Sequence, residues 1–253
     1  MNMNRTQPRR MRNTQQGFTL VELSIAVLIG LFLLGGLLTL VQDMRRTFGA
    51  QNSLAQLQDS ERLAMTLIAD VIQAAGFYPD PTQDTALSSF PGGTIFGATF
   101  AQPGQSIIGT RNAAAPGDTL SVQFRTAPND GVINCTGSTN TSGVLKTFVN
   151  TFSVDGLGNL TCTLNGVAAP LISGVTNLQI LYGVKTLFVL TNNNVDTFLN
   201  AAQMTAADWS NVICVKVTLT FTNPLFATQP QQPATIPFTR VVTVMSRAGV
   251  NTT

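Results

Sequence analysis

The sequence predicts an α+β protein in which a long N-terminal α-helix packs on an antiparallel β-sheet. Three observations favour this fold class. An apolar run at residues 18–41 is long enough for a membrane-spanning helix. A stripe of apolar residues at helical spacing then continues to Ala75. In the C-terminal two-thirds of the chain, several segments alternate apolar and polar residues, which is the pattern of half-buried strands.

The composition suits an extracytoplasmic domain that packs against neighbours better than it suits a cytosolic enzyme. Of the 253 residues, 44% are hydrophobic and only 10% are charged, whereas soluble domains average roughly a quarter charged. From Phe77 onward, seven basic residues balance seven acidic ones, so we expect no nucleic-acid partner, which would require a basic surface. The chain has no histidine, the commonest general base and zinc ligand. We therefore expect no enzymatic activity, catalytic residue, metal or cofactor.

The chain begins with a polar leader, residues 1–17, which contains four arginines and no acidic residue. The next 24 residues, 18–41, would form a helix about 36 Å long, enough to cross a hydrocarbon core of ~30 Å. This run is longer than the apolar region of a secretory signal peptide, and no convincing small-residue cleavage site follows it. The basic leader places the N-terminus in the cytoplasm by the positive-inside rule.

Glu22 is an acidic residue inside this apolar run. A carboxylate at bilayer depth costs roughly 2.5–3.5 kcal/mol on insertion scales, and less near an interface, so a membrane helix keeps one when a partner neutralises it. Cleavage after Gly17 would create such a partner, the new α-amino group of Phe18, in the same chain or in a neighbouring one.

The leader and the apolar run meet in the segment GFTLVEL, residues 17–23. This junction closely resembles the signature of type IV prepilins. The resemblance implies that a prepilin peptidase cleaves between Gly17 and Phe18 and that the new terminal residue, Phe18, is methylated. It also implies that Glu22 pairs with the N-terminus of a neighbouring subunit during assembly. The alternative is an ordinary single-pass anchor in which Glu22 has no special role.

Beyond the membrane the helix is expected to continue as an amphipathic segment and to end at Gly76, since two prolines follow closely. The expected organisation is a leader at 1–17, a helix at 18–76 and a β-rich periplasmic or extracellular domain at 77–253. The apolar stripe is expected to cover the sheet, with a dimer seam as the alternative. Its members are Leu54, Leu57, Ala64, Leu67, Ile68, Val71, Ile72 and Ala75.

The C-terminal domain starts with a segment rich in Pro, Gly, Ser and Thr, residues 77–116, which is expected to form loops with short strands. Four later segments have the pattern of strands, at residues 120–125, 178–184, 213–221 and 238–245. Alternation of this kind indicates an antiparallel sheet with one face covered, and the helical stripe is the obvious cover.

Several short stretches, in order along nearly the whole chain, resemble one branch of the prepilin superfamily, the PilW-type minor pilins. The stretches are the helix end LAMTLIADVIQAAGF, the pair Cys135 and Cys162 around a polar segment, PLISGV leading to LQILYGV at residues 170–184, WSNV at 209–212, and a closing strand that ends near Arg247.

The chain has three cysteines and no Cys-x-x-Cys pair, so one disulfide with one thiol left over is the simplest expectation. Cys135 and Cys162 both lie in polar, turn-rich sequence, and the pair belongs to the resemblance with PilW. Cys214 lies inside an alternating strand. We predict a disulfide between Cys135 and Cys162, with Cys214 unpaired, although the third cysteine departs from the resemblance and leaves the pairing formally ambiguous.

Two loops have the oxygen-rich composition of calcium sites. Residues 155–159, DGLGN, lack the regular acidic spacing and the distal glutamate of an EF-hand, so a hairpin turn is favoured. Residues 192–196, NNNVD, are likewise expected to be a polar loop.

The resemblance favours a minor pilin that helps to initiate a type IV pilus and is built into the fibre. It implies as partners a prepilin peptidase, other minor and major pilins through the helix, and an inner-membrane assembly platform. The protein is then expected in the bacterial inner membrane before assembly, and in the pilus fibre or at its tip on the cell surface afterwards. Two alternatives stay open: a minor pseudopilin of a type II secretion system, and a fibre-borne adhesin or DNA-uptake subunit. Polar loops such as residues 136–142 suit an adhesin, whereas the even charge argues against DNA uptake.

Overall fold

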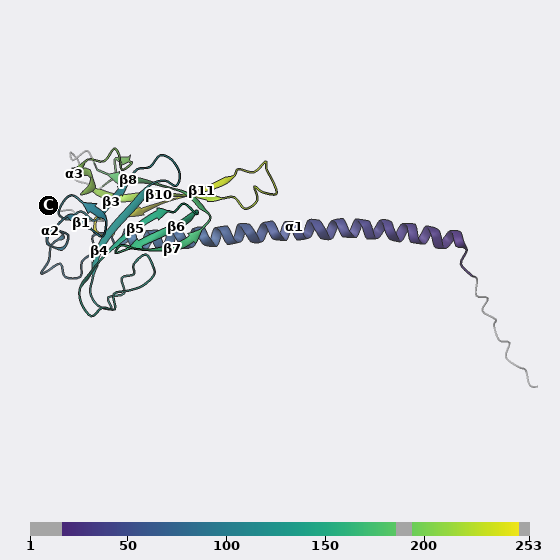
Figure 1. Cartoon of the computed structure of the whole chain (residues 1–253), viewed down its shortest axis with the longest axis horizontal. Helices are drawn as coiled ribbons and strands as arrows, with labels where there is room; N and C mark the ends of the chain where they lie inside the picture. Colours follow the sequence, from purple (N-terminus) through teal and green to yellow (C-terminus); the bar gives the residue numbers. More distant parts are fainter. Residues whose placement is uncertain (1–16, 186–193, 248–253) are drawn as a thin grey trace, which may run out of the picture. The chain divides into compact units, whose positions relative to one another are not determined.

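The computed structural model describes residues 17–185 and 194–247. The chain divides into two compact units, residues 1–51 and 52–253. One long helix, α1 (Leu20–Gln73), belongs to both units (Figure 1). The expected α+β class, with an N-terminal helix and antiparallel sheets, is confirmed.

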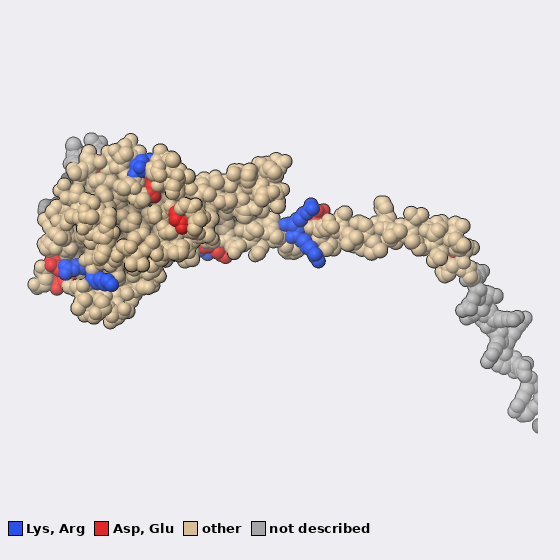
Figure 2. Space-filling view, in the orientation of Figure 1, with Lys and Arg blue, Asp and Glu red and all other residues tan. Residues whose placement is uncertain are grey.

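The second unit contains the strands and the short helices. Charged side chains are sparse on the face of the protein shown in Figure 2, in line with the composition. The elements after α1 are, in chain order, α2 (Ala86–Ser89), β1 (Gly93–Ile95), β2 (Ala98–Phe100), β3 (Ile107–Thr110), β4 (Thr119–Thr126), β5 (Lys146–Val154), β6 (Asn159–Leu164), β7 (Val167–Ser173), β8 (Val175–Val184), β9 (Thr197–Leu199), α3 (Ala206–Trp209), β10 (Val212–Thr222), β11 (Thr235–Thr243) and the 3₁₀ helix η1 (Met245–Arg247).

These strands form three antiparallel sheets. Strands β3 to β7 form a five-stranded sheet in simple chain order, and β1 pairs with β2. The third sheet has the order β11-β10-β8-β9, so that β8 and β10 lie at its centre. The four strands expected from alternation fall in β4, β8, β10 and β11, although β11 begins earlier than expected and ends at Thr243.

The C-terminal end of α1 is part of the hydrophobic core. Ala64, Ile68, Val71 and Ile72 are buried in one cluster with residues from both large sheets. The apolar stripe therefore covers the sheets, as expected, and burial of an apolar face is what stabilises such a helix. Met65, which does not belong to the apolar stripe, is buried in the same cluster.

The helix ends at Gln73, three residues before the expected stop, because residues 74–76 form a turn. Gly76 has φ +72°, a conformation that suits glycine after a helix. The chain is then fixed to β4, because the Gly76 N–H donates to the Gln123 carbonyl at 3.0 Å and the Arg125 N–H donates to the Phe77 carbonyl at 2.8 Å.

Burial in two strands differs from simple alternation. In β4, the polar residues Ser121 and Gln123 are buried as well as the apolar ones. Gln123 is accommodated because its Nε2 donates to the Gln105 carbonyl at 2.7 Å. In β10, Cys214 is buried despite its place on the expected polar face, next to a register shift between Val212 and Cys214.

Candidate functional site

The residues around the expected cleavage site precede the helix. Gly17, Phe18 and Thr19 are non-helical and exposed, and no atom lies within 4 Å of the position that a Cβ on Gly17 would take. Thr19 caps α1, since its Oγ1 accepts from the Glu22 N–H at 3.3 Å and its carbonyl accepts from the Leu23 N–H at 3.1 Å. The Gly17–Phe18 peptide bond is therefore sterically open.

Glu22 lies in the first turn of α1 and is exposed. An acidic side chain in this position interacts favourably with the helix dipole. No cationic side chain of the described residues forms an ion pair with Glu22. Within one described chain, the carboxylate thus has no partner except the helix end on which it sits.

The N-terminal part of α1 exposes an almost continuous apolar surface. The helix is long and apolar enough to cross a membrane, and none of the apolar window is buried within the protein. Its exposed large apolar side chains include Leu20, Leu28, Leu31, Phe32 and Leu38. A surface of this kind requires lipid or another helix to cover it.

In the sheet domain, a disulfide joins the expected pair, Cys135 and Cys162, with the two Cα atoms 6.3 Å apart. Both cysteines are fully buried. The Cys135 N–H also donates to the side-chain oxygen of Asn150 at 2.9 Å. The disulfide and this hydrogen bond fix the loop at residues 127–145 to strands β5 and β6.

Two asparagines order the rest of this loop. The Oδ1 of Asn134 accepts from the N–H of Thr136 at 2.9 Å and from its hydroxyl at 2.7 Å. Asn140 accepts from Ser142 in the same way, and its Nδ2 donates to the carbonyls of Thr126 and Val144. The polar loop suggested as a recognition surface is therefore held in one shape by its own side chains, with most of its residues exposed.

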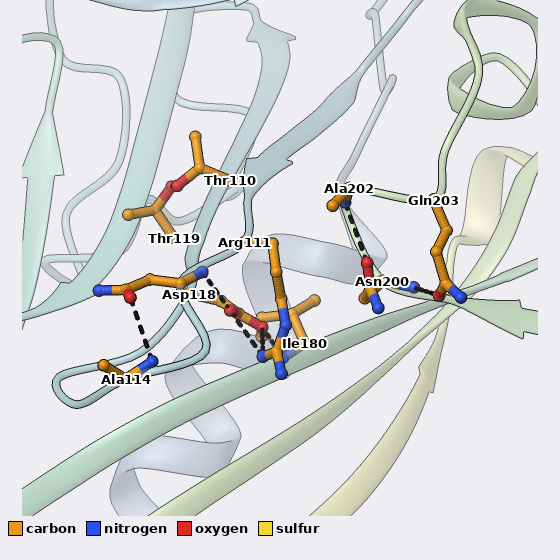
Figure 3. Close-up of polar contacts among 10 residues, drawn as sticks. Thr110, Arg111, Ala114, Asp118, Thr119, Ile180, Asn200, Ala202 and Gln203 are labelled. Atoms are coloured by element: carbon orange, nitrogen blue, oxygen red, sulfur yellow. Dashed lines mark hydrogen bonds and ion pairs between the residues drawn. The ribbon is translucent and has the colours of Figure 1, made fainter.

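A buried ionic cluster connects the two large sheets (Figure 3). Asp118 has a side chain that is 2% exposed, and its carboxylate accepts from Arg111 Nη1 at 2.9 and 3.1 Å. It also accepts from the N–H of Asn112 at 2.9 Å and from the N–H of Ile180, in β8, at 2.8 Å. Four hydrogen bonds thus satisfy a carboxylate that would otherwise be costly to bury.

Cys214 is unpaired and buried. Burial raises the pKa of its thiol, and a hydrogen bond with the Gly183 backbone lowers it to a smaller extent. The thiol packs so closely on Gly183 that a Cβ at that position would meet the sulfur. Cys214 is consequently part of the packing between β8 and β10.

The loop at residues 155–158 is a hairpin turn between β5 and β6, as favoured from the sequence. The carboxylate of Asp155 accepts from the N–H groups of Leu157 and Asn159 and from the Asn159 side chain. Among the described residues, no group of three or more acidic or cysteine side chains could hold a metal ion. Residues 192 and 193, in the second loop considered for calcium, lie outside the described residues.

Sequence reasoning missed Asp118, Asn134 and Asn140. For the two asparagines a signal was available, because a Thr or a Ser stands two residues later in both cases, the spacing of a side chain that closes a turn on its own backbone. For Asp118 no local signal exists, since Ile180 lies 62 residues away.

Two family models match the chain. The Prokaryotic N-terminal methylation motif matches residues 12–38, and Type IV Pilus-assembly protein W matches residues 138–246. Among solved structures, a type IV-like pilin from Thermus thermophilus is similar, with 13% identity over 76% of this chain and 97% of that one, and a TM-score of 0.41. No curated protein matches.

The first of these matches includes Gly17, Phe18 and Glu22, and the second covers most of the sheet domain, from the loop before β5 to the end of β11. The apolar helix and the methylation motif together indicate a membrane-anchored chain. Proteins of this family and fold are structural rather than enzymatic. The resemblance predicted from the sequence is confirmed: the chain is PilW-like over residues 138–246 and carries the prokaryotic N-terminal methylation motif at residues 12–38.

Proposed function

We propose that this protein is a minor pilin, which helps to initiate assembly of a type IV pilus and is incorporated into the fibre. The observation that carries the proposal is the combination, in one chain, of the methylation motif and a sheet domain that matches the pilus-assembly family PilW. The motif contains the cleavage site, the terminal residue to be methylated and the glutamate that a subunit needs to enter a fibre. The sheet domain decides which fibre it joins.

In this proposal the leader, residues 1–17, stays in the cytoplasm, and residues 18–41 cross the inner membrane. A prepilin peptidase cleaves the exposed Gly17–Phe18 bond, and Phe18 is then methylated. The described residues offer no cationic side chain to Glu22, which supports pairing of this carboxylate with the N-terminal amine of a neighbouring subunit.

The partners are then other minor and major pilins, which contact the exposed apolar part of the helix, and the inner-membrane assembly platform. When the subunit leaves the membrane, its apolar helix surface is no longer in contact with lipid. Helices of neighbouring pilins in the fibre would then bury this surface. The domain at residues 77–253 faces the periplasm first and the outside of the cell after assembly.

The experiment that tests the proposal is a deletion of the gene in its own host, complemented by the wild-type protein. Surface pili are counted by electron microscopy, twitching is measured on agar, and secreted proteins are compared by mass spectrometry. Loss of pili and twitching with intact secretion is the expected result. Loss of secretion with normal pili contradicts it and favours a minor pseudopilin of a type II secretion system.

Copy number provides a second readout in the same strains. A minor pilin should be present in sheared, purified pili at a small fraction of the amount of the major subunit, as measured by quantitative mass spectrometry. Its absence from purified pili at native expression contradicts incorporation into the fibre, even if pili are lost on deletion.

A further inference from the structure

The outer face of the four-stranded sheet carries a pocket of about 240 Å³. Residues on this face alternate with Ile180 and Val217, which point into the core, so the pocket opens on the side away from the core. We call it the Lys216 pocket. Its polar lining consists of Arg111, Gln179, Asn200, Lys216, Thr218 and Thr239.

The guanidinium of Arg111 is held in place by the buried Asp118 (Figure 3). Both contacts to the carboxylate use Nη1, and Nε and Nη2 make no hydrogen bond to another described residue. The carboxylate of Asp118 also accepts hydrogen bonds from two backbone N–H groups, those of Asn112 and Ile180. Arg111 therefore presents free donors at the pocket from a fixed position, as preorganised binding requires.

Lys216 is the second cation of the pocket. It is half-buried, and its partners in the adjacent strands are the apolar residues Leu181 and Val241. Among the residues that the structure describes, none forms an ion pair or a hydrogen bond with its ammonium group. Lys216 is therefore the cation of the pocket whose charge no described carboxylate offsets, and it favours an anion beside the free N–H donors of Arg111.

The rest of the lining offers neutral polar groups. The hydroxyls of Thr218 and Thr239 bond each other at 2.9 Å and keep acceptor lone pairs for a ligand. Asn200 uses its backbone N–H and Oδ1 within its own turn, bonding Gln203 and Ala202, so its Nδ2 group is left for a ligand (Figure 3). Gln179 is exposed at the edge of the pocket.

We infer that the Lys216 pocket binds a small sugar that bears a carboxylate, such as a uronic acid. The ammonium group of Lys216 and the free N–H donors of Arg111 suit the carboxylate, and the hydroxyl and amide groups suit the ring hydroxyls. The volume is below the roughly 300–1,000 Å³ of pockets for drug-sized ligands, so one sugar ring fits better than a larger molecule. Leu181 supplies an apolar patch for the C–H groups of the ring.

Isothermal titration calorimetry of the full chain in detergent micelles tests this inference. Glucuronate and glucose form a matched pair of probes, because they differ only in the carboxylate that replaces a CH₂OH group. We expect glucuronate to bind and glucose to give no heat beyond the heat of dilution. We also expect roughly 0.5 M NaCl to weaken glucuronate binding, because salt screens the attraction between the charges. Equal binding of both sugars, or no binding of glucuronate at millimolar concentration, overturns the inference.

Two charge-matched variants locate the site. Lys216→Gln removes a cation of the pocket, whereas Arg240→Gln removes one from the opposite face of the same sheet, where Arg240 is exposed and pairs with Val217. We expect glucuronate affinity to fall on the order of tenfold in Lys216→Gln and to stay unchanged in Arg240→Gln. Equal losses in both variants place the interaction elsewhere and contradict the assignment.

The same titration with N-acetylglutamate α-methylamide, which has only the side-chain carboxylate, separates a sugar carboxylate from a protein carboxylate. Weaker binding of this probe than of glucuronate supports the sugar, because the ring hydroxyls then contribute. Tighter binding of this probe overturns the assignment, since a carboxylate of another protein subunit would then be the better ligand. Unchanged unfolding curves, followed through the fluorescence of the single tryptophan, Trp209, establish that each variant is folded.

Discussion

The carboxylate of Asp118 accepts a hydrogen bond from the backbone N–H of Ile180, 2.8 Å away and 62 residues later in the chain. Asp118 directly precedes β4 of the five-stranded sheet, and Ile180 lies in β8 of the four-stranded sheet. The Asp118 N–H in turn donates to the Leu178 carbonyl at 2.7 Å. The two sheets are thus joined by hydrogen bonds as well as by the shared apolar core.

Replacement of Asp118 by alanine should destabilise the domain severely. The change leaves the N–H groups of Asn112 and Ile180 and the guanidinium of Arg111 without their acceptor. Removing one member of a buried ion pair costs about 3–5 kcal/mol, and partial exposure of Arg111 places the expected loss at the lower end. Urea unfolding followed by Trp209 fluorescence measures the loss.

The matched control for this change is Asp59→Ala, since Asp59 is an exposed acid of α1 in the same compact unit. Its substitution should change the free energy of unfolding by less than about 0.5 kcal/mol. If both variants unfold at the same urea concentration as the wild type, Asp118 does not stabilise the contact between the sheets.

Reduction of the disulfide should lower stability by about 3–4 kcal/mol on the chain-entropy estimate, because the bond closes a loop with a sequence separation of 27 residues. The measurement compares urea unfolding with and without reductant. In Cys214→Ala the effect of the reductant should persist, whereas in Cys135→Ala/Cys162→Ala it should vanish. If the reductant has no effect on the stability of Cys214→Ala, then Cys214 takes part in the disulfide, and the assignment to Cys135 and Cys162 is wrong.

The thiol of Cys214 should react slowly in the folded protein. Burial raises its pKa, so less of the reactive thiolate is present at a given pH than for an ordinary cysteine, with a pKa of about 8.5. Iodoacetamide labelling should be much faster in roughly 8 M urea than in native buffer. In native buffer, the labelling rate should still be rising with pH above about pH 8.5. Labelling is followed by mass spectrometry, with Cys214→Ala as the unlabelled reference.

The raised pKa also sets the sign of a pH effect on stability. The unfolded thiol loses its proton from about pH 8.5 upward, while the folded thiol keeps it, so that the folded state becomes less stable as pH rises through this range. In Cys214→Ala, this part of the alkaline loss of stability should be absent. Fast native labelling at neutral pH would show that the thiol is accessible in the folded protein and would contradict its burial.

Cleavage is predicted between Gly17 and Phe18, where both residues are exposed and non-helical. Protein purified from its own host should give an intact mass that corresponds to a chain starting at methylated Phe18. The same protein from a strain without prepilin peptidase should keep the leader and serves as the control. A chain that still carries the leader, in a host with active peptidase, contradicts the prediction.

Glu22→Gln should leave cleavage intact and lower incorporation into fibres, because the change removes the charge that pairs with the amine of a neighbouring Phe18. Asp43→Asn is the matched control, since Asp43 lies on the same helix beyond the apolar run. Immunoblots of sheared pili and of membranes, at native expression, give the incorporated fraction. Equal incorporation of both variants argues against the pairing.

The long helix, its buried stripe and the central strands could be predicted because each depends on a periodic pattern within a short segment. The five-stranded sheet was harder to predict, since polar residues occupy buried positions in it. The strand β4 was expected from its alternation, although the burial of Gln123 was not, whereas in β5 the fully buried Asn150 breaks the apolar pattern. The short strand β9 has only three residues and too little sequence for a period.

The N-terminal site residues could be predicted for the same reason, because Gly17, Phe18 and Glu22 lie within six consecutive positions. In the sheet domain, the disulfide pair Cys135 and Cys162 was predicted, but the residues of the ionic cluster and of the Lys216 pocket could not be. Lys216 has the appearance of an ordinary exposed position on a half-buried strand, and only the tertiary fold brings Arg111 close to it. Contacts between distant segments leave no local pattern in a sequence.

The connection between α1 and the sheet domain has a mechanical consequence for a fibre subunit. Tension along the helix is passed to the domain by its buried face and, where the helix ends, by residues 75–77. There, Gly76 and Phe77 are tied to β4, in the five-stranded sheet. The Ala75 carbonyl accepts from the hydroxyl of Ser246 at 2.7 Å, shortly after β11 of the four-stranded sheet. A force on the helix is therefore shared between both sheets, so that neither sheet can be separated from the helix without force on the other.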